Sequence, residues 1–122
     1  MSRILVVEDT QDINELVCHF LESEGHETTK AVNGEIAIKI LEKDKDFQLI
    51  ILDIIMPRQD GFDVINELKE QNIDIPVLGI SGGGRTISGE VALKAVEPSV
   101  TKVLKKPFTK NTLMQEISDI LG

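Results

Sequence analysis

Short apolar runs alternate along the chain with longer segments in which apolar residues recur every three or four positions. The short runs are rich in valine, isoleucine and leucine, which suit buried strands, and the longer segments have the period of amphipathic helices. This alternation is typical of βα units that build a parallel sheet. The sequence predicts five strands, at residues 4–7, 27–31, 49–52, 77–80 and 102–104.

The predicted strand at residues 27–31 differs from the others because polar side chains interrupt it. It contains Glu27 and Lys30 among threonines, whereas residues 49–52 are apolar throughout. Strands that are buried on both faces read as continuous apolar runs, and polar strands are found at the edges of sheets. We therefore expect residues 27–31 to form an edge strand.

The segments between the strands predict helices with an apolar stripe toward the sheet. The clearest helix follows the first strand and stops at Gly25, a residue type common at helix ends. Asn33 and Thr109 stand where they can cap the second and last helices, and residues 60–61 turn into the third. The predicted stripes are Ile13, Leu16, Val17, Phe20 and Leu21; Ile36, Ile40 and Leu41; Val64, Ile65 and Leu68; and Leu113, Met114, Ile117, Ile120 and Leu121.

The fourth predicted helix is the least regular. Glycines stand at positions 82–84 and 89, and the modest apolar run at residues 91–96 ends before Pro98. Glycine loosens the backbone, and the residue before a proline is disfavoured in a helix. We expect this helix to be short and mobile.

The composition fits one compact cytoplasmic domain over residues 1–122. The chain has 122 residues and 41% hydrophobic content, enough for one buried core. Its 13 basic and 21 acidic residues give a net charge of −8, which disfavours direct nucleic-acid binding. A single cysteine, Cys18, fits a reducing compartment, and neither a signal peptide nor an apolar run of about 20 residues points to a membrane.

Chemically versatile side chains stand where the predicted strands end. Glu8 and Asp9 follow the first strand, Asp53 the third and Ser81 the fourth, while Lys106 follows the fifth. The carboxyl ends of parallel strands meet at one edge of an α/β sheet, where such proteins bind their ligands. We therefore expect these side chains to converge.

Converging carboxylates suit a hard divalent cation such as Mg²⁺ or Mn²⁺, which prefers oxygen ligands. Crowded carboxylates repel one another, and a bound cation or a lysine relieves that repulsion. A carboxylate held beside a metal and a lysine can attack phosphorus and form an acyl phosphate. Ser81 offers a hydroxyl to a phosphoryl oxygen, and Gly82 allows close approach of its backbone N–H.

Each of these features by itself also has an ordinary structural explanation. Adjacent acids are usually solvated, and an aspartate after a strand is often a turn former. Lys102, Lys105 and Lys106 all compete for the place beside the carboxylates, and because side chains alternate along a strand, only one of two adjacent lysines should reach them. The joint occurrence of all the groups at strand ends favours a functional site.

In these motifs the chain resembles, over its whole length, the receiver domain of response regulators in two-component signalling. The resemblance rests on the pair Glu8–Asp9, on the segment DIIMPRQDG at residues 53–61, on Ser81, and on Lys106 within KKPF. It implies a doubly wound (βα)5 flavodoxin-like three-layer sandwich with strand order 2-1-3-4-5. Because the match takes up the whole chain, we expect a stand-alone receiver domain with no output domain.

The resemblance further implies the role of each site residue. Asp53 is the phosphoacceptor, Ser81 the switch hydroxyl and Lys106 the partner of the phosphoryl group, with Gly82 beside it. The metal ligands are Glu8, Asp9, Asp53 and the backbone carbonyl of Ile55. The phosphoryl donor is a sensor histidine kinase or a histidine phosphotransfer protein, and the Lys106–Pro107 peptide bond is cis.

The same resemblance describes a switch that catalyses only its own phosphorylation and dephosphorylation and signals to a downstream protein. Related domains often dimerise, but the sequence leaves homodimer formation open. Receivers often carry an aromatic residue three positions before the lysine, where this chain has Val103. We therefore expect signalling to run through residues 82–88 and the helix that follows. Ile55 is apolar and cannot orient an attacking water, which predicts slow self-dephosphorylation.

Two other classes of function fit parts of the pattern. A metal-dependent phosphohydrolase with an aspartate nucleophile generally needs an acid two residues after the nucleophile, where this chain has Ile55. An interaction module with a degenerate site would not need the complete set of acidic, hydroxyl and lysine groups. The sequence favours the signalling switch over both alternatives.

Overall fold

The computed structural model describes residues 2–54, 60–81, 94 and 97–122, in which strands and helices alternate. All five predicted strands are present, and each extends at most one residue beyond the predicted range at either end. The strands are β1 (Arg3–Val7), β2 (Glu27–Ala31), β3 (Leu49–Asp53), β4 (Val77–Ser81) and β5 (Lys102–Lys105). The helices are α1 (Gln11–Ser23), α2 (Gly34–Lys43), α3 (Asp60–Glu70) and α5 (Lys110–Leu121), with a short 3-10 helix, η2 (Glu97–Ser99).

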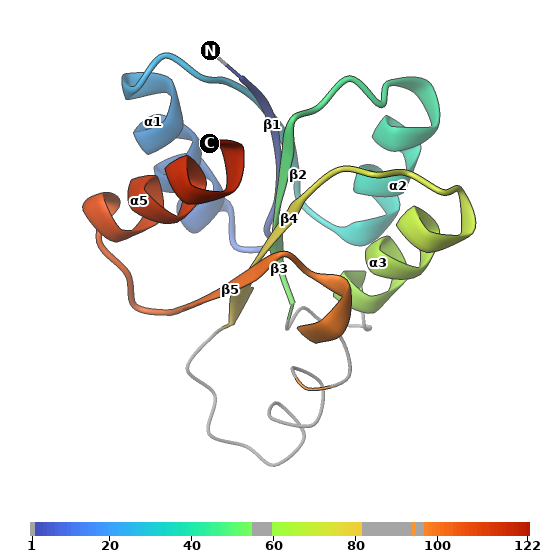
Figure 1. Ribbon diagram of the computed structural model, residues 1–122. Coiled ribbons are helices and arrows are strands. Elements are labelled where there is room, and N and C mark those ends of the chain that lie inside the picture. Colours follow the sequence, from blue (N-terminus) through green and yellow to red (C-terminus); the bar gives the residue numbers. More distant parts are fainter. Residues whose placement is uncertain (1, 55–59, 82–93, 95–96) are drawn as a thin grey trace.

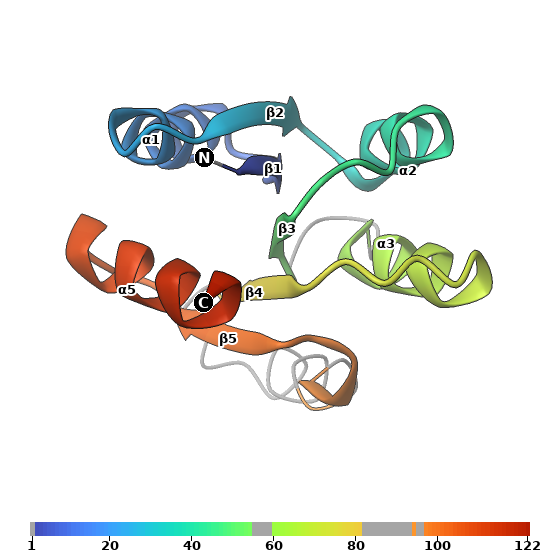
Figure 2. The same ribbon diagram turned by 45° about the horizontal axis from the view of Figure 1, so that its top comes forward.

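The described strands form one parallel sheet in the order β2-β1-β3-β4-β5. Helices α1 and α5 cover one face of the sheet, and α2 and α3 cover the other (Figures 1 and 2). This is the predicted doubly wound, flavodoxin-like arrangement, with its topological switch point between β1 and β3. The polar strand β2 lies at an edge, as predicted, and pairs with β1 from Arg3↔Glu27 to Val7↔Ala31.

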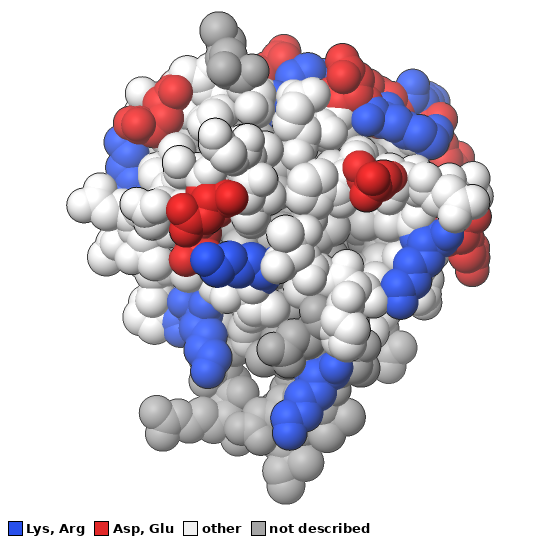
Figure 3. All heavy atoms as spheres, in the orientation of Figure 1, with Lys and Arg blue, Asp and Glu red and all other residues white. Residues whose placement is uncertain are grey.

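The helices begin largely as their sequence indicates. The Asn33 side chain accepts a hydrogen bond from the Ile36 backbone N–H at 2.8 Å, and Thr109 Oγ1 accepts one from the Thr112 N–H at 3.1 Å, which confirms both caps. On the face of the molecule that Figure 3 shows, acidic and basic side chains lie next to one another in several places. Among the described residues, none of the helices combines the length and apolar character that crossing a membrane requires.

Two positions in the predicted apolar stripes were wrong. The side chain of Leu16 is 49% exposed and that of Ile36 is 38% exposed. In α1 the buried residues are Asn14, Val17, Cys18 and Leu21, which lie on one side of a helix with 3.6 residues per turn and leave Leu16 on the other. The predicted helix at residues 91–96 falls, apart from residue 94, outside the described residues.

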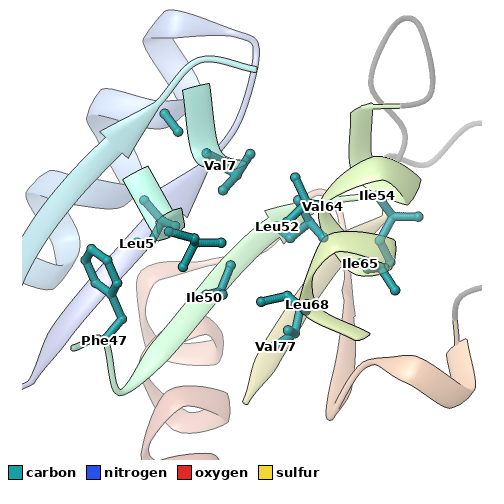
Figure 4. Packing of buried hydrophobic residues seen from close by; sticks show 13 residues of the cluster. Leu5, Val7, Phe47, Ile50, Leu52, Ile54, Val64, Ile65, Leu68 and Val77 are labelled. Atoms are coloured by element: carbon teal, nitrogen blue, oxygen red, sulfur yellow. The ribbon is translucent and has the colours of Figure 1, made fainter. Parts of the chain in front are cut away.

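The core consists of two apolar layers, one on each face of the sheet. Because successive strand residues point to opposite faces, Leu5 and Val7 pack toward α2 and α3, whereas Ile4 and Val6 pack toward α1 and α5. Figure 4 shows the first layer, in which Val64, Ile65 and Leu68 of α3 lie over the middle of the sheet. Burial on both faces explains why β1, β3 and β4 read as nearly continuous apolar runs.

The residue that follows β3 is held by close packing at two glycines. A Cβ built on Gly61 of α3 would lie 2.5 Å from the carbonyl oxygen of Ile54 and 3.1 Å from that of Asp53. A Cβ built on Gly79 of β4 would lie 2.6 Å from Ile54 Cδ1, so the Ile54 side chain occupies the space beside that glycine. The first contact restrains the backbone at the carboxyl end of β3, and the second restrains the Ile54 side chain.

We predict that Gly61→Ala lowers the free energy of unfolding by about 1–3 kcal/mol, because the added methyl group overlaps a backbone carbonyl that cannot easily move. Elsewhere in a helix, replacing glycine by alanine raises stability by roughly 0.5–1 kcal/mol. Urea denaturation measures the change. Asn66→Ala, at an exposed position of α3, is the matched control and should leave stability unchanged or slightly higher. Wild-type stability of Gly61→Ala would contradict the close approach.

Candidate functional site

The structure brings the predicted acidic groups together at the carboxyl edge of the sheet. Glu8 and Asp9 directly follow β1, and Asp53 is the last residue of the neighbouring strand β3. Carboxylate oxygens of Glu8, Asp9 and Asp53 all lie within 4.8 Å of one another. Glu8 and Asp53 are each only 3% exposed, whereas Asp9 is exposed to solvent.

Lys106, which directly follows β5, is the lysine that reaches these carboxylates. Its Nζ lies 2.9 Å from Glu8 Oε1 and 3.4 Å from Asp53 Oδ2. Lys102 instead pairs with Glu116 of α5 at 2.7 Å, and Lys105 is exposed. The structure therefore distinguishes between the three candidate lysines, and the Lys106–Pro107 peptide bond is cis, as predicted.

The remaining predicted site residues lie on β4 and in the loops. Ser81 is the last residue of β4 and is buried, and its backbone carbonyl accepts a hydrogen bond from the Lys106 N–H at 2.8 Å. This bond joins the ends of β4 and β5 beside the acidic groups. Ile55 and Gly82, predicted to supply a metal-binding carbonyl and a backbone N–H, both fall outside the described residues.

The electrostatic environment differs for the two acids of the pair. Burial is the largest influence on the pKa of Glu8 and raises it, but hydrogen bonds from the Lys106 ammonium and the Thr10 backbone outweigh burial and leave the pKa below its ordinary value. The pKa of Asp9 lies above its ordinary value because of partial burial and the neighbouring Glu8 carboxylate. The Lys106 ammonium thus favours the ionised form of Glu8, whereas the surroundings of Asp9 on balance disfavour its ionised form.

Lys106 stays protonated in this environment. Burial lowers its pKa, but the hydrogen bond to Glu8 and the charge of Asp53 outweigh burial, so that the net shift is upward. A protonated lysine that contacts two buried carboxylates offsets part of their negative charge.

The donor set fits a hard divalent cation. All three acidic ligands offer carboxylate oxygens, and Mg²⁺ usually takes one or two carboxylates together with waters and phosphate oxygens. Three carboxylates and one ammonium leave a formal charge of −2 on these four side chains, which a divalent cation offsets. Glu8, Asp9 and Asp53 are the residues that would hold Mg²⁺ or Mn²⁺.

Comparison with known proteins decides the family. Residues 4–118 match the family model described as the response regulator receiver domain. The chain belongs to that family. Receiver domains of this kind are the signal-accepting parts of two-component response regulators, and the acidic groups and lysine described above lie at the edge of the sheet where such α/β domains bind ligands.

Individual relatives of this receiver domain include both long proteins and single domains. It is 32% identical over 121 residues to the response regulator SaeR of Staphylococcus aureus strain USA300, covering 99% of this chain and 51% of SaeR. The crystal structure of NtrX from Brucella abortus is 34% identical with a TM-score of 0.84, over 98% of this chain and 27% of NtrX. The chemotaxis protein CheY4 of Vibrio cholerae is 29% identical with a TM-score of 0.83, over 99% of each chain. The chain thus spans about half the length of SaeR.

One contributor to this site was missed from the sequence. Asn14, in the first turns of α1, is buried, and its side chain donates hydrogen bonds to backbone carbonyls around Glu8. A polar residue on an amphipathic helix is normally read as facing solvent. The available signal was its spacing of three and seven residues from Val17 and Leu21, which places Asn14 on the buried side of the helix.

We predict that Lys106→Met destabilises the protein in EDTA at pH 7 by about 1–3 kcal/mol, because two buried carboxylates lose their cationic partner. Methionine keeps the aliphatic stem and removes only the charged end. Lys105→Met, at the exposed neighbouring position, is the matched control and should be close to neutral.

The pH dependence of this loss gives a sharper test. In the wild type the lowered pKa of Glu8 means that its favourable contribution is present above the ordinary glutamate pKa of 4.5 and is lost as the pH falls. In Lys106→Met, burial acts on Glu8 without the lysine and raises the pKa, so that the ionised carboxylate opposes folding above pH 4.5. The difference from wild type, measured by urea denaturation, should therefore grow from about pH 4 to pH 7. A difference independent of pH would contradict this account.

Proposed function

We propose that this receiver domain is a response-regulator switch that accepts a phosphoryl group on Asp53. The donor is the phosphohistidine of a sensor histidine kinase or of a histidine phosphotransfer protein, and the reaction depends on Mg²⁺ or Mn²⁺. The observation that carries the proposal is the contact of Lys106 Nζ with both Asp53 and Glu8, beside the Asp9 carboxylate. Membership of the receiver family supports it.

The proposed reaction is an in-line transfer to a carboxylate. An Asp53 carboxylate oxygen attacks phosphorus, the P–N bond of the phosphohistidine breaks with its electron pair going to the imidazole, and the product is an acyl phosphate. A bound divalent cation, held by Glu8, Asp9, Asp53 and the Ile55 carbonyl, would neutralise charge on the phosphoryl oxygens.

The chain's own groups have complementary roles in this proposal. Lys106 pairs with the Asp53 carboxylate before the reaction and with a phosphoryl oxygen afterwards. Ser81 offers its hydroxyl to a second oxygen, and the backbone N–H of Gly82 approaches the same group. We assign no turnover of other substrates to the domain, because these groups serve a phosphoryl group that remains attached to Asp53.

The phosphoryl group then shifts the population toward a signalling conformation through its contacts with Ser81 and Lys106. Val103 occupies the place of the frequent aromatic residue and is partly buried against the α2–α3 side of the core. We propose that the signal is read through residues 82–88 and the helix that follows, which, apart from residue 94, lie outside the described residues. The net charge of −8 favours a protein over a nucleic acid as the downstream partner. We place this interaction in the cytoplasm.

The first test is phosphorylation with the small-molecule donor acetyl phosphate and Mg²⁺, followed by intact-mass measurement. We expect one stable phosphoryl adduct on the wild type and none on Asp53→Asn. Asp63→Asn, at an exposed position of α3, is the matched control and should be phosphorylated like the wild type. EDTA should abolish the adduct. A wild-type protein that acquires no adduct, or an adduct that persists on Asp53→Asn, would contradict the proposal.

The second test concerns the lifetime of the acyl phosphate. Because the isoleucine side chain at position 55 cannot hydrogen-bond to a water, we expect Ile55→Asn to hydrolyse its phosphoryl group at least severalfold faster than the wild type. Ile55→Val, which stays apolar, is the control and should keep the wild-type rate. Loss of the mass adduct over time after removal of acetyl phosphate gives the rates. Equal lifetimes for Ile55→Asn and Ile55→Val would refute this expectation.

A further inference from the structure

The side chain of Asn14 forms an unusual set of contacts for a residue on an amphipathic helix. It is 1% exposed and points from α1 toward the carboxyl ends of β1 and β2. Its Nδ2 lies 3.1 Å from the Glu8 carbonyl oxygen, 3.2 Å from that of Ala31 and 3.3 Å from that of Val6. Its Oδ1 accepts a hydrogen bond from Cys18 Sγ at 3.4 Å, which fixes the orientation of the amide.

These contacts hold the backbone of Glu8 just beyond the end of the strand pairing. The register of β1 and β2 ends at Val7↔Ala31, and the Glu8 N–H then donates to the Ala31 carbonyl at 3.0 Å. With Asn14 donating to its carbonyl, Glu8 is held at both backbone polar groups. The Thr10 N–H donates to Glu8 Oε2 at 3.0 Å, which fixes the side chain as well.

The turn that carries the acidic pair needs such a restraint. Residues 8–10 belong to neither β1 nor α1, and they hold two carboxylates near a third, that of Asp53. Like charges at this separation repel, and a free turn would relieve the repulsion by moving away from β3. Lys106 opposes that movement for Glu8, but Asp9 is exposed and depends on the position of its backbone.

An amide is the group that suits this position. Its two N–H protons can be shared among three carbonyl acceptors, whereas an apolar side chain would leave those carbonyls with fewer partners in a buried place. An ionised carboxylate in the same place would bring its oxygens, which can only accept hydrogen bonds, against the carbonyl oxygens, which are also acceptors. The chemistry of the contacts therefore distinguishes asparagine from residues of similar size.

We propose that Asn14 is a positioning residue for the cation site: by holding the turn at residues 8–10, it sets Glu8 and Asp9 opposite Asp53 and thereby determines the affinity for Mg²⁺. The inference rests on the proposed function. It adds a residue that touches neither the cation nor the phosphoryl group and acts through the backbone of the acidic pair.

The test compares Asn14→Leu with Val17→Ala. Leucine has about the shape of asparagine but no donor, whereas Val17→Ala removes buried packing from the same side of α1 at a side chain that cannot hydrogen-bond to residues 8–10. Each protein is titrated with Mg²⁺ alone, and binding is monitored by backbone NMR at a temperature at which the wild type and both variants are folded. We expect Asn14→Leu to bind Mg²⁺ about tenfold more weakly, as for other residues that orient metal ligands, and Val17→Ala to bind like the wild type.

A second measurement separates positioning from general stability. At low Mg²⁺, Asn14→Leu should be phosphorylated by acetyl phosphate more slowly than the wild type, and saturating Mg²⁺ should restore the rate. Wild-type Mg²⁺ affinity in Asn14→Leu, an equal loss in Val17→Ala, or a slow rate that persists at saturating Mg²⁺ would each overturn the proposal. If Asn14→Leu does not fold, Asn14→Ala is compared in the same way with the same outcomes.

The outcome for Asn14 can be distinguished from failure of the proposed function. If the wild type itself neither binds Mg²⁺ nor becomes phosphorylated, the proposed function is wrong. That result would also overturn the effect of Asn14 on Mg²⁺ affinity, and only its hold on the turn at residues 8–10 would remain to be decided, by amide hydrogen exchange at Glu8 and Thr10. Exchange at these two amides should accelerate in Asn14→Leu and not in Val17→Ala, and equal exchange in the two variants would overturn the role.

Discussion

The arrangement of this receiver domain depends on the ion pairs of Lys106 with Glu8 and Asp53. Glu8 and Asp53 lie 98 and 53 residues before Lys106 in the sequence, so these pairs connect the beginning, middle and end of the chain. Ionised carboxylates that are 3% exposed are costly to bury, and a cationic partner with good hydrogen bonds offsets that cost. The pairs in turn require the strand order, which places β1 beside β3 and leaves only β4 between β3 and β5. Close packing of Gly61 and Gly79 against Ile54 restrains the end of β3 that carries Asp53.

Much of this fold could be predicted because its three central strands, β1, β3 and β4, are buried on both faces. Their apolar runs, bounded by polar residues, predicted these strands to within a residue, and their polar ends located Glu8, Asp53 and Ser81. The choice of Lys106 over Lys102 and Lys105 was different. Alternation along a strand indicated that one of two adjacent lysines reaches the site but not which, and family resemblance supplied the answer that the structure now shows.

The errors came from helices, where sequence periodicity has more than one solution. Leu16 fits an apolar spacing with Phe20, yet the buried side of α1 runs through Asn14, Val17 and Leu21. The buried side of the helix contains an asparagine, and a polar residue among buried positions changes which side of the helix the sequence indicates as buried. The carbonyls of Val6, Glu8 and Ala31 explain why Asn14 is buried, and these contacts arise from tertiary structure that periodicity does not contain.

The charge balance of the site explains why its parts are held so differently. Three carboxylates against one ammonium leave an excess of two negative charges. Partial burial and, after it, the neighbouring Glu8 carboxylate raise the pKa of Asp9. The Glu8 carboxylate contacts Lys106 Nζ and accepts a hydrogen bond from the Thr10 N–H, and its backbone carbonyl accepts one from Asn14. Asp9 remains exposed to solvent. A divalent cation that removes the excess would therefore interact with an acidic pair in which one member is fixed and the other is open to it. Rigid placement of Glu8 and accessibility of Asp9 are then two requirements of the same site, because the first keeps the carboxylates close and the second lets the balancing charge enter.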